Sequence, residues 1–158
     1  MASASTTRAN KELVRRFANE FVNESNYDTA REFLDVDIVD STPLGETTGR
    51  EAIVETTKEL RTAFPDFVVT PEETVAEKDT VVVRMTQRGT HEGVFMGHEA
   101  TGNAFEIEAM AFLRLEDGKI AERRVRPDVL GMLRQLGDHD TANRITRATV
   151  TPIVFRFT

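Results

Sequence analysis

The chain has 158 residues, no cysteine and a formal net charge of −7. This length predicts one domain with one functional site, and the absence of thiols excludes disulfides, thiol catalysis and cysteine-ligated metals. The acidic balance predicts no nucleic-acid binding, because such binding needs a basic surface that displaces counterions from phosphates. No apolar run approaches the ~20 residues of a membrane span, so we expect no membrane partner.

The ends of the chain differ in character from its middle. Residues 1–10 lack the apolar core of a signal peptide, and we expect them to be a disordered N-terminus of a cytoplasmic protein. Residues 11–137 carry the periodic patterns of the folded domain. The tail at 138–158 begins polar and ends in a β-prone run, which we expect to dock as an extra strand, to swap onto a partner, or to be disordered.

Helical periodicity comes first along the domain. Apolar side chains recur at i, i+4 and i+8 in residues 7–24, as on one stripe of a helix. A second, short helix is expected at 28–34. A third is expected at 50–63, where Thr48 and Glu51 have the spacing of a capping box.

The second half of the domain alternates with the period of strands. After a brief strand at 36–40, longer strands are expected at 67–76, 80–90, 104–115 and 119–126. An Asp-Gly pair joins the last two as a two-residue hairpin, and a short helix at residues 129–136 closes the domain. Helices followed by strands predict an α+β fold, in which three N-terminal helices pack on a strongly curved, mainly antiparallel sheet around a small-ligand cavity.

The hairpin turn predicts which side chains share a face with Asp128, the residue before the closing helix. With a two-residue turn, the facing pairs are Ile107 and Asp128, Ala109 and Arg126, and Ala111 and Arg124. A β-bulge after Ile120 would exchange the two faces.

Two roles are open for Asp128. A carboxylate on an apolar, partly closed wall loses hydration and suits general acid–base catalysis, an effect that nearby Arg124 and Arg126 oppose. Alternatively, Asp128 only caps the closing helix, since Asp readily accepts hydrogen bonds from free N–H groups there.

Other polar and aromatic residues are weaker candidates. His91, in the loop after the second long strand, can donate to a carbonyl oxygen or carry a proton, and Phe17 is either core or cavity wall. The three histidines lack the spacing of metal ligands, and the glycine-rich loop at 89–97 fits no phosphate-binding pattern, so we expect neither a metal nor a nucleotide cofactor.

Several segments together resemble the SnoaL-like polyketide cyclases, also called ester cyclases, of the NTF2-like superfamily. They are VRRF at 14–17, GREAI at 49–53, AFPDF at 63–67, GTHEGVFMG and TG within 89–102, and DGKIAERRVRPDVLGMLRQLG at 117–137. The resemblance covers residues 13–137 in the order of the family. It implies an NTF2-like cone fold. It also implies an enzyme that closes a ring in a polyketide ester by a cofactor-independent intramolecular aldol reaction, with Asp128 as general acid and base.

The chain departs from the family pattern at two places. A His-Trp pair is usual where Arg123 and Arg124 stand, and a His is usual near Ser41. We therefore expect a more cationic pocket for an anionic or polyketide-like small molecule. The expected substrate-binding residues are Phe17, Ser41, His91, Ala109, Ala111, Arg124 and Arg126.

Two other functions stay open, a noncatalytic ligand-binding or dimerisation module and a small hydrolase that activates water with Asp128. A sheet face that the helices leave uncovered predicts a homodimer.

Overall fold

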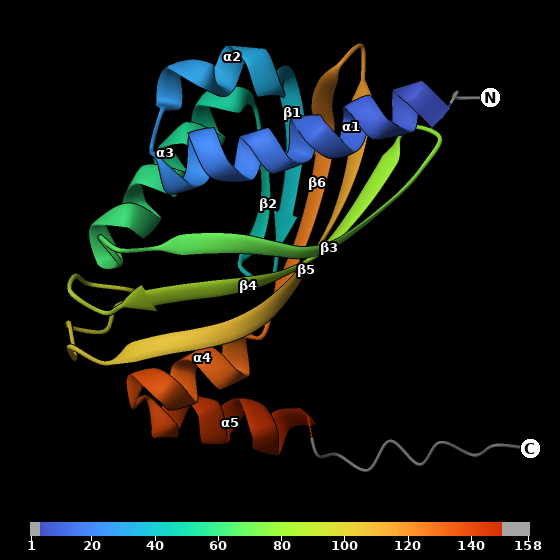
Figure 1. The fold of residues 1–158 in the computed structure, drawn as a ribbon. Coiled ribbons are helices and arrows are strands. Elements are labelled where there is room, and N and C mark those ends of the chain that lie inside the picture. The colour runs from blue at the N-terminus through green and yellow to red at the C-terminus, as the bar shows by residue number, and fades with distance from the viewer. Residues whose placement is uncertain (1–3, 150–158) are drawn as a thin grey trace, which may run out of the picture.

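The computed structural model describes residues 4–149, in which a strongly curved sheet carries helices across one face and at one end (Figure 1). The six strands follow the order β2-β1-β6-β5-β4-β3. Neighbouring strands are antiparallel except β1 and β6, which run parallel. The predicted α+β class and curved, mainly antiparallel sheet are confirmed.

The N-terminal helix has two parts. α1 (Ala4–Arg16) continues directly into η1 (Phe17–Asn23), a π-helix, so the helix predicted at 7–24 is confirmed in extent. Asn23 ends it by bonding both the N–H and the carbonyl of Val69 at 2.8 Å, which ties the helix to the sheet. Because the helix begins at Ala4, the prediction of a disordered segment at 1–10 is wrong for 4–10, and residues 1–3 lie outside the described range.

The next helices lie on the same face of the sheet. A short 3-10 turn, η2 (Tyr27–Thr29), leads into α2 (Ala30–Phe33), and α3 (Arg50–Ala63) has the predicted bounds. The predicted capping box is wrong, because the N-cap of α3 is Gly49, which has a φ of 100° and no capping side chain. Thr48 is instead the last residue of a strand.

That strand, β2 (Gly45–Thr48), was not predicted from the sequence. It pairs antiparallel with β1 (Leu34–Thr42), which extends beyond the predicted 36–40 at both ends. The turn between them carries Leu44 at the surface. The sheet is therefore extended by one short edge strand next to α3.

The remaining strands agree closely with the predicted ones. They are β3 (Val68–Glu77), β4 (Thr80–Thr90), β5 (Ala104–Glu116) and β6 (Lys119–Pro127). Asp117 and Gly118 form the hairpin turn with φ angles of 51° and 73°, as a type I′ turn requires.

The C-terminal helices cover the end of β5. α4 (Val129–Leu136) ends at Gly137 in the left-handed conformation, as predicted, and α5 (His139–Thr149) packs against it. Residues 139–149 are therefore a helix and not an added strand, whereas 150–158 lie outside the described range. No helix within 4–149 is long and apolar enough to cross a membrane.

Candidate functional site

A cavity of about 660 Å³ lies between the helices and the sheet. This volume is within the range of small-molecule sites. Its floor comes from β4 and β5, its walls from η1, α3 and β6, and its mouth from the β1–β2 turn and the loop after β4. The main apolar residues that line it are Phe17, Val22, Leu44, Leu60, Val83, Met85, Val94, Met96, Ala111, Leu113, Val125 and Met132. The interior therefore favours a largely apolar ligand.

The π-helical geometry of η1 shapes one wall. A π-helix has more residues in each turn than an α-helix and is frequent at functional sites. In η1 it presents Phe17, Ala18 and Val22 to the cavity while Phe17 stacks on Phe21, with ring centroids 5.1 Å apart. Phe17 is therefore both a buried core residue and part of the cavity wall, the two positions left open by the sequence, and its role in binding stays a prediction.

A β-bulge in β6 decides which of its side chains enter the cavity. Leu115 pairs with Ile120, as the two-residue turn predicts, but Arg114 pairs with Glu122, so Ala121 is an extra residue on β6. Beyond Ala121, each residue of β6 therefore faces a β5 residue one position away from the predicted partner. The side chains of β6 that were expected to point outward point into the cavity instead. The predicted face that joins Asp128, Arg124 and Arg126 with the cavity wall is therefore wrong.

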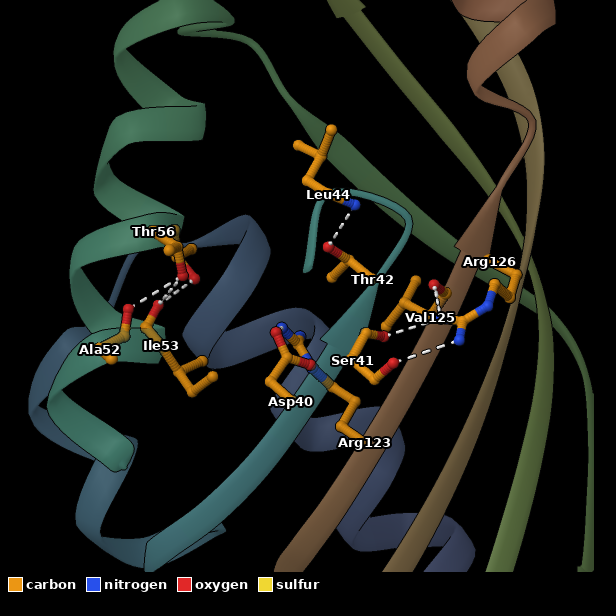
Figure 2. Close-up of polar contacts among 11 residues, drawn as sticks. Asp40, Ser41, Thr42, Leu44, Ala52, Ile53, Thr56, Arg123, Val125 and Arg126 are labelled. Carbon is orange, nitrogen blue, oxygen red and sulfur yellow. Dashed lines mark hydrogen bonds and ion pairs between the residues drawn. The ribbon is translucent and has the colours of Figure 1, made fainter. Parts of the chain in front are cut away.

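The bulge instead brings Arg123 into the cavity beside Asp40 of β1 (Figure 2). The two are register partners on parallel strands. Arg123 Nε donates to Asp40 Oδ1 at 2.7 Å and Nη2 to Oδ2 at 3.0 Å, a bidentate ion pair. The side chains are only 6% (Asp40) and 17% (Arg123) exposed. This pair places fixed charge on an otherwise apolar wall.

Arg124, Arg126 and Ser41 lie on the opposite face of the sheet. Arg124 pairs with Glu122 at 2.6 Å and thereby lowers the pKa of that carboxyl group. Arg126 donates to the carbonyl of Ser41 at 3.0 Å and to its Oγ at 3.2 Å (Figure 2). The structure brings Ser41 and Arg126 together, but outside the cavity that they were expected to line.

Asp128 sits at the rim as the N-cap of α4. Its Oδ1 accepts a hydrogen bond from the Gly131 N–H at 2.9 Å, and the side chain is exposed. Any Cβ at Gly131 would lie 2.2 Å from the carboxylate, so this close approach requires glycine. The flanking residues Pro127 and Val129 line the cavity, whereas Asp128 does not. The structure thus shows the capping role directly.

His91 is also outside the cavity. It is only 1% exposed, lies 5.6 Å from the ring of Phe64, and places Nδ1 3.1 Å from Thr101 Oγ1. These contacts hold the base of the loop whose tip forms part of the mouth. His98, further along the loop, contacts Asp138 at 2.8 Å and so joins the loop to the start of α5.

Of the predicted binding residues, the structure brings Phe17 and Ala111 to the cavity. Ala109 is buried in the core beside Pro127 and does not line it. Asp40 and Arg123 were not among the predicted site residues. The alternation Ile38, Asp40, Thr42 pointed to an inward Asp40, since Ile38 is an obvious core residue.

Comparison with known proteins agrees with this architecture. The family model for SnoaL-like polyketide cyclases matches residues 12–136. Aklanonic acid methyl ester cyclase DnrD of Streptomyces peucetius is 32% identical over 131 residues, which are 80% of this chain and 90% of that protein. The nogalonic acid methyl ester cyclase of Streptomyces nogalater is 30% identical over 119 residues, covering 73% and 89%.

Solved structures show the same fold. IdmH of Streptomyces antibioticus has a TM-score of 0.73 and 30% identity, covering 81% of this chain and 98% of its own. A family protein from Jannaschia sp. CCS1 has a TM-score of 0.79 at 23% identity, covering 86% and 96%, and supports the fold alone. The fold is thus an NTF2-like cone. The chain belongs to the SnoaL-like polyketide cyclase family, which confirms the resemblance seen in its sequence.

Proposed function

We propose that the protein closes a ring in a polyketide-like ester by an intramolecular aldol reaction inside the cavity, without a metal or organic cofactor. The observation that carries this proposal is the apolar cavity of about 660 Å³ in a chain whose relatives are named as methyl ester cyclases. Ring closure by aldol addition requires two carbons of one flexible chain to meet. An enclosing wall that holds them together can contribute several kcal/mol.

The reaction needs one group that moves a proton. A C–H beside a carbonyl loses its proton to a base, the enolate carbon attacks a second carbonyl, and the resulting alkoxide takes up a proton, so that no atom is gained or lost. We assign the proton transfer to Asp128, directly or through a water. Support comes from its place in the family-matched segment and from its position between two cavity-lining residues.

The charges of the lining favour an ester, which has no free carboxylate, as the substrate. Among the described residues that line the cavity, three are acidic, namely Asp40, Glu46 and Glu59, and Arg123 is the single cation. Arg123 is already paired with Asp40, and the other two carboxylates are exposed. The expectation of an anionic ligand relied on Arg123 and Arg124 in place of the family's His-Trp pair, but Arg124 lies outside the cavity and only Arg123 lines it. A free carboxylate near Glu46 or Glu59 would be repelled, whereas the inner wall carries Arg123.

Incubation with aklanonic acid methyl ester and with nogalonic acid methyl ester tests the proposal. We expect at least one to give a product of unchanged mass and altered chromatographic retention, because ring closure is an isomerisation. Ala111→Phe should slow this conversion at least about tenfold, because a phenyl ring would occupy the cavity. Glu108→Phe, on the opposite face of the same strand, is the matched control.

Each other outcome identifies an alternative function. A product of lower mass, from loss of methanol and gain of water, would support the hydrolase. Saturable binding of both esters without any product would support the noncatalytic module.

We also propose that the protein is a homodimer, because the helices leave one face of the sheet uncovered. Met110 and Phe112 on β5 are 51% and 49% exposed, and Val82 on β4 is register partner of Phe112. Large apolar side chains grouped on one face typically mark an interface. Phe112→Glu should convert a dimer into a monomer, measured as mass by light scattering, whereas Thr62→Glu on α3 should leave the dimer intact. A monomeric wild-type protein at micromolar concentration would contradict the prediction.

A further inference from the structure

We propose that Arg123 is a catalytic residue that binds the oxyanion formed on the substrate, and that Asp40 is its positioning residue. The inference rests on the proposed ring-closing function for its chemistry. It assigns a site on the inner wall, separate from Asp128 at the rim. Three features of the cavity carry it: the geometry of the ion pair, the unused donors of Arg123, and the apolar surroundings.

The ion pair holds the guanidinium in one orientation. Its two hydrogen bonds of 2.7 and 3.0 Å to Asp40 form a planar fork, which fixes direction better than a single contact. The guanidinium carbon also lies 5.8 Å from the ring centroid of Phe17, a cation–π contact on the wall of η1. Arg123 therefore meets a ligand with little reorganisation.

Arg123 keeps donors free for a ligand. A guanidinium has five N–H groups, and Asp40 takes one from Nε and one from Nη2. Within residues 4–149, Arg123 donates to no residue besides Asp40. The other three N–H groups belong to a side chain that lines the cavity, where an oxygen of a bound ligand can accept them.

During ring closure, negative charge forms on carbonyl oxygens, which the free N–H groups of Arg123 can stabilise. When a C–H beside the carbonyl loses its proton, the electron pair moves onto the carbonyl oxygen, and when the new C–C bond forms, the charge passes to the second carbonyl oxygen. Arginine stays protonated at neutral pH, so Arg123 stabilises these oxyanions by donating hydrogen bonds and cannot itself be the base. The proton returns to the alkoxide from the group that removed it.

A purely structural role explains the pair less well. Burying an ion pair costs desolvation, and well-packed apolar residues of similar size are often at least as stable. The neighbouring wall residues Val83, Leu113 and Val125 show that this surface is otherwise built from apolar side chains. A donor set facing a cavity among such residues points to a polar atom of a ligand.

A nitronaphthol is a suitable probe, because its naphtholate carries one oxyanion on an apolar ring system and its absorbance reports ionisation. We expect wild-type protein to bind the naphtholate more tightly than the neutral naphthol. Arg123→Met should weaken naphtholate binding at least about tenfold and remove this preference, while Arg123→Lys should retain part of it. Asp40→Asn should retain more of the preference than Arg123→Met, because the cation stays in the wall.

Two controls keep the test decisive. Arg124→Met removes the adjacent arginine on the outer face and should leave binding unchanged. The double variant Asp40→Asn/Arg123→Met leaves no unpaired charge in the wall, so it provides a folded protein if the single variant does not fold, and it should show the same loss. Unchanged naphtholate binding in Arg123→Met or in the double variant, or no naphtholate binding by the wild type, would overturn the proposal.

The outcome separates this inference from the proposed function. Turnover of the methyl esters together with Arg123-independent naphtholate binding would refute the oxyanion site alone. Arg123-dependent binding without turnover of either ester would refute the cyclase function and leave an oxyanion-binding cavity.

Discussion

Asp128→Asn is expected to lower turnover of the ester substrate roughly 10²- to 10⁴-fold, the usual contribution of a general acid–base group. The same substitution should change the free energy of unfolding little, because Asn caps helices as well as Asp does. The side chain would keep its bond to the Gly131 N–H and lose only the ability to carry a proton. Initial rates and chemical denaturation of one protein preparation measure both effects.

Asp128→Ala provides the comparison. It removes the cap of α4 and should cost about 1 kcal/mol of stability in addition to the lost turnover. If Asp128→Asn retains full turnover while Asp128→Ala is destabilised, Asp128 is a helix cap and nothing more. The proton transfer would then have to be assigned elsewhere in the cavity.

Arg123→Met should destabilise the fold by roughly 2–4 kcal/mol, because it leaves the carboxylate of Asp40 buried without its partner. The upper part of the range for buried pairs is not expected, since Asp40 lines a cavity that water can enter. The double variant Asp40→Asn/Arg123→Met removes both charges and should recover most of the lost stability. Urea denaturation of the wild type, the two single variants and the double variant gives the coupling free energy.

Arg124→Met is the control for this series too. Its guanidinium is largely exposed and paired with Glu122 at the surface, so its loss should cost at most about 1 kcal/mol. Equal destabilisation by Arg123→Met and Arg124→Met would contradict the importance assigned to the buried pair. A double variant no more stable than Arg123→Met would show that the loss comes from packing and not from the unpaired charge.

Much of the fold could be predicted from local patterns. Helix α3, strand β4 and helix α4 have the predicted bounds, because strong periodicity and clear breakers such as Pro65 and Gly137 mark them. Strand β2 could not be predicted in this way, since its glycine and three polar residues carry no alternating pattern. Its pairing with β1 depends on tertiary structure.

The candidate site was harder to predict because it depends on register. Facing pairs along β5 and β6 were counted from the hairpin turn, and one extra residue at Ala121 reversed every later assignment. Phe17 and Ala111 were placed correctly because their faces do not depend on that count. Local alternation indicates that Asp40 points inward, but its pairing with Arg123, 83 residues away across a parallel strand pair, has no local signal.

The bulge at Ala121 also indicates how the lining of such a cavity can change during evolution. Losing this single residue would rotate the remainder of β6 by one position, moving Arg123 to the outside and bringing an outer neighbour into the wall. One codon gained or lost near the start of this strand can therefore replace the charged lining of the cavity without altering any other strand. An insertion or deletion here would change ligand preference in one evolutionary step, which point substitutions could match only by several coordinated changes.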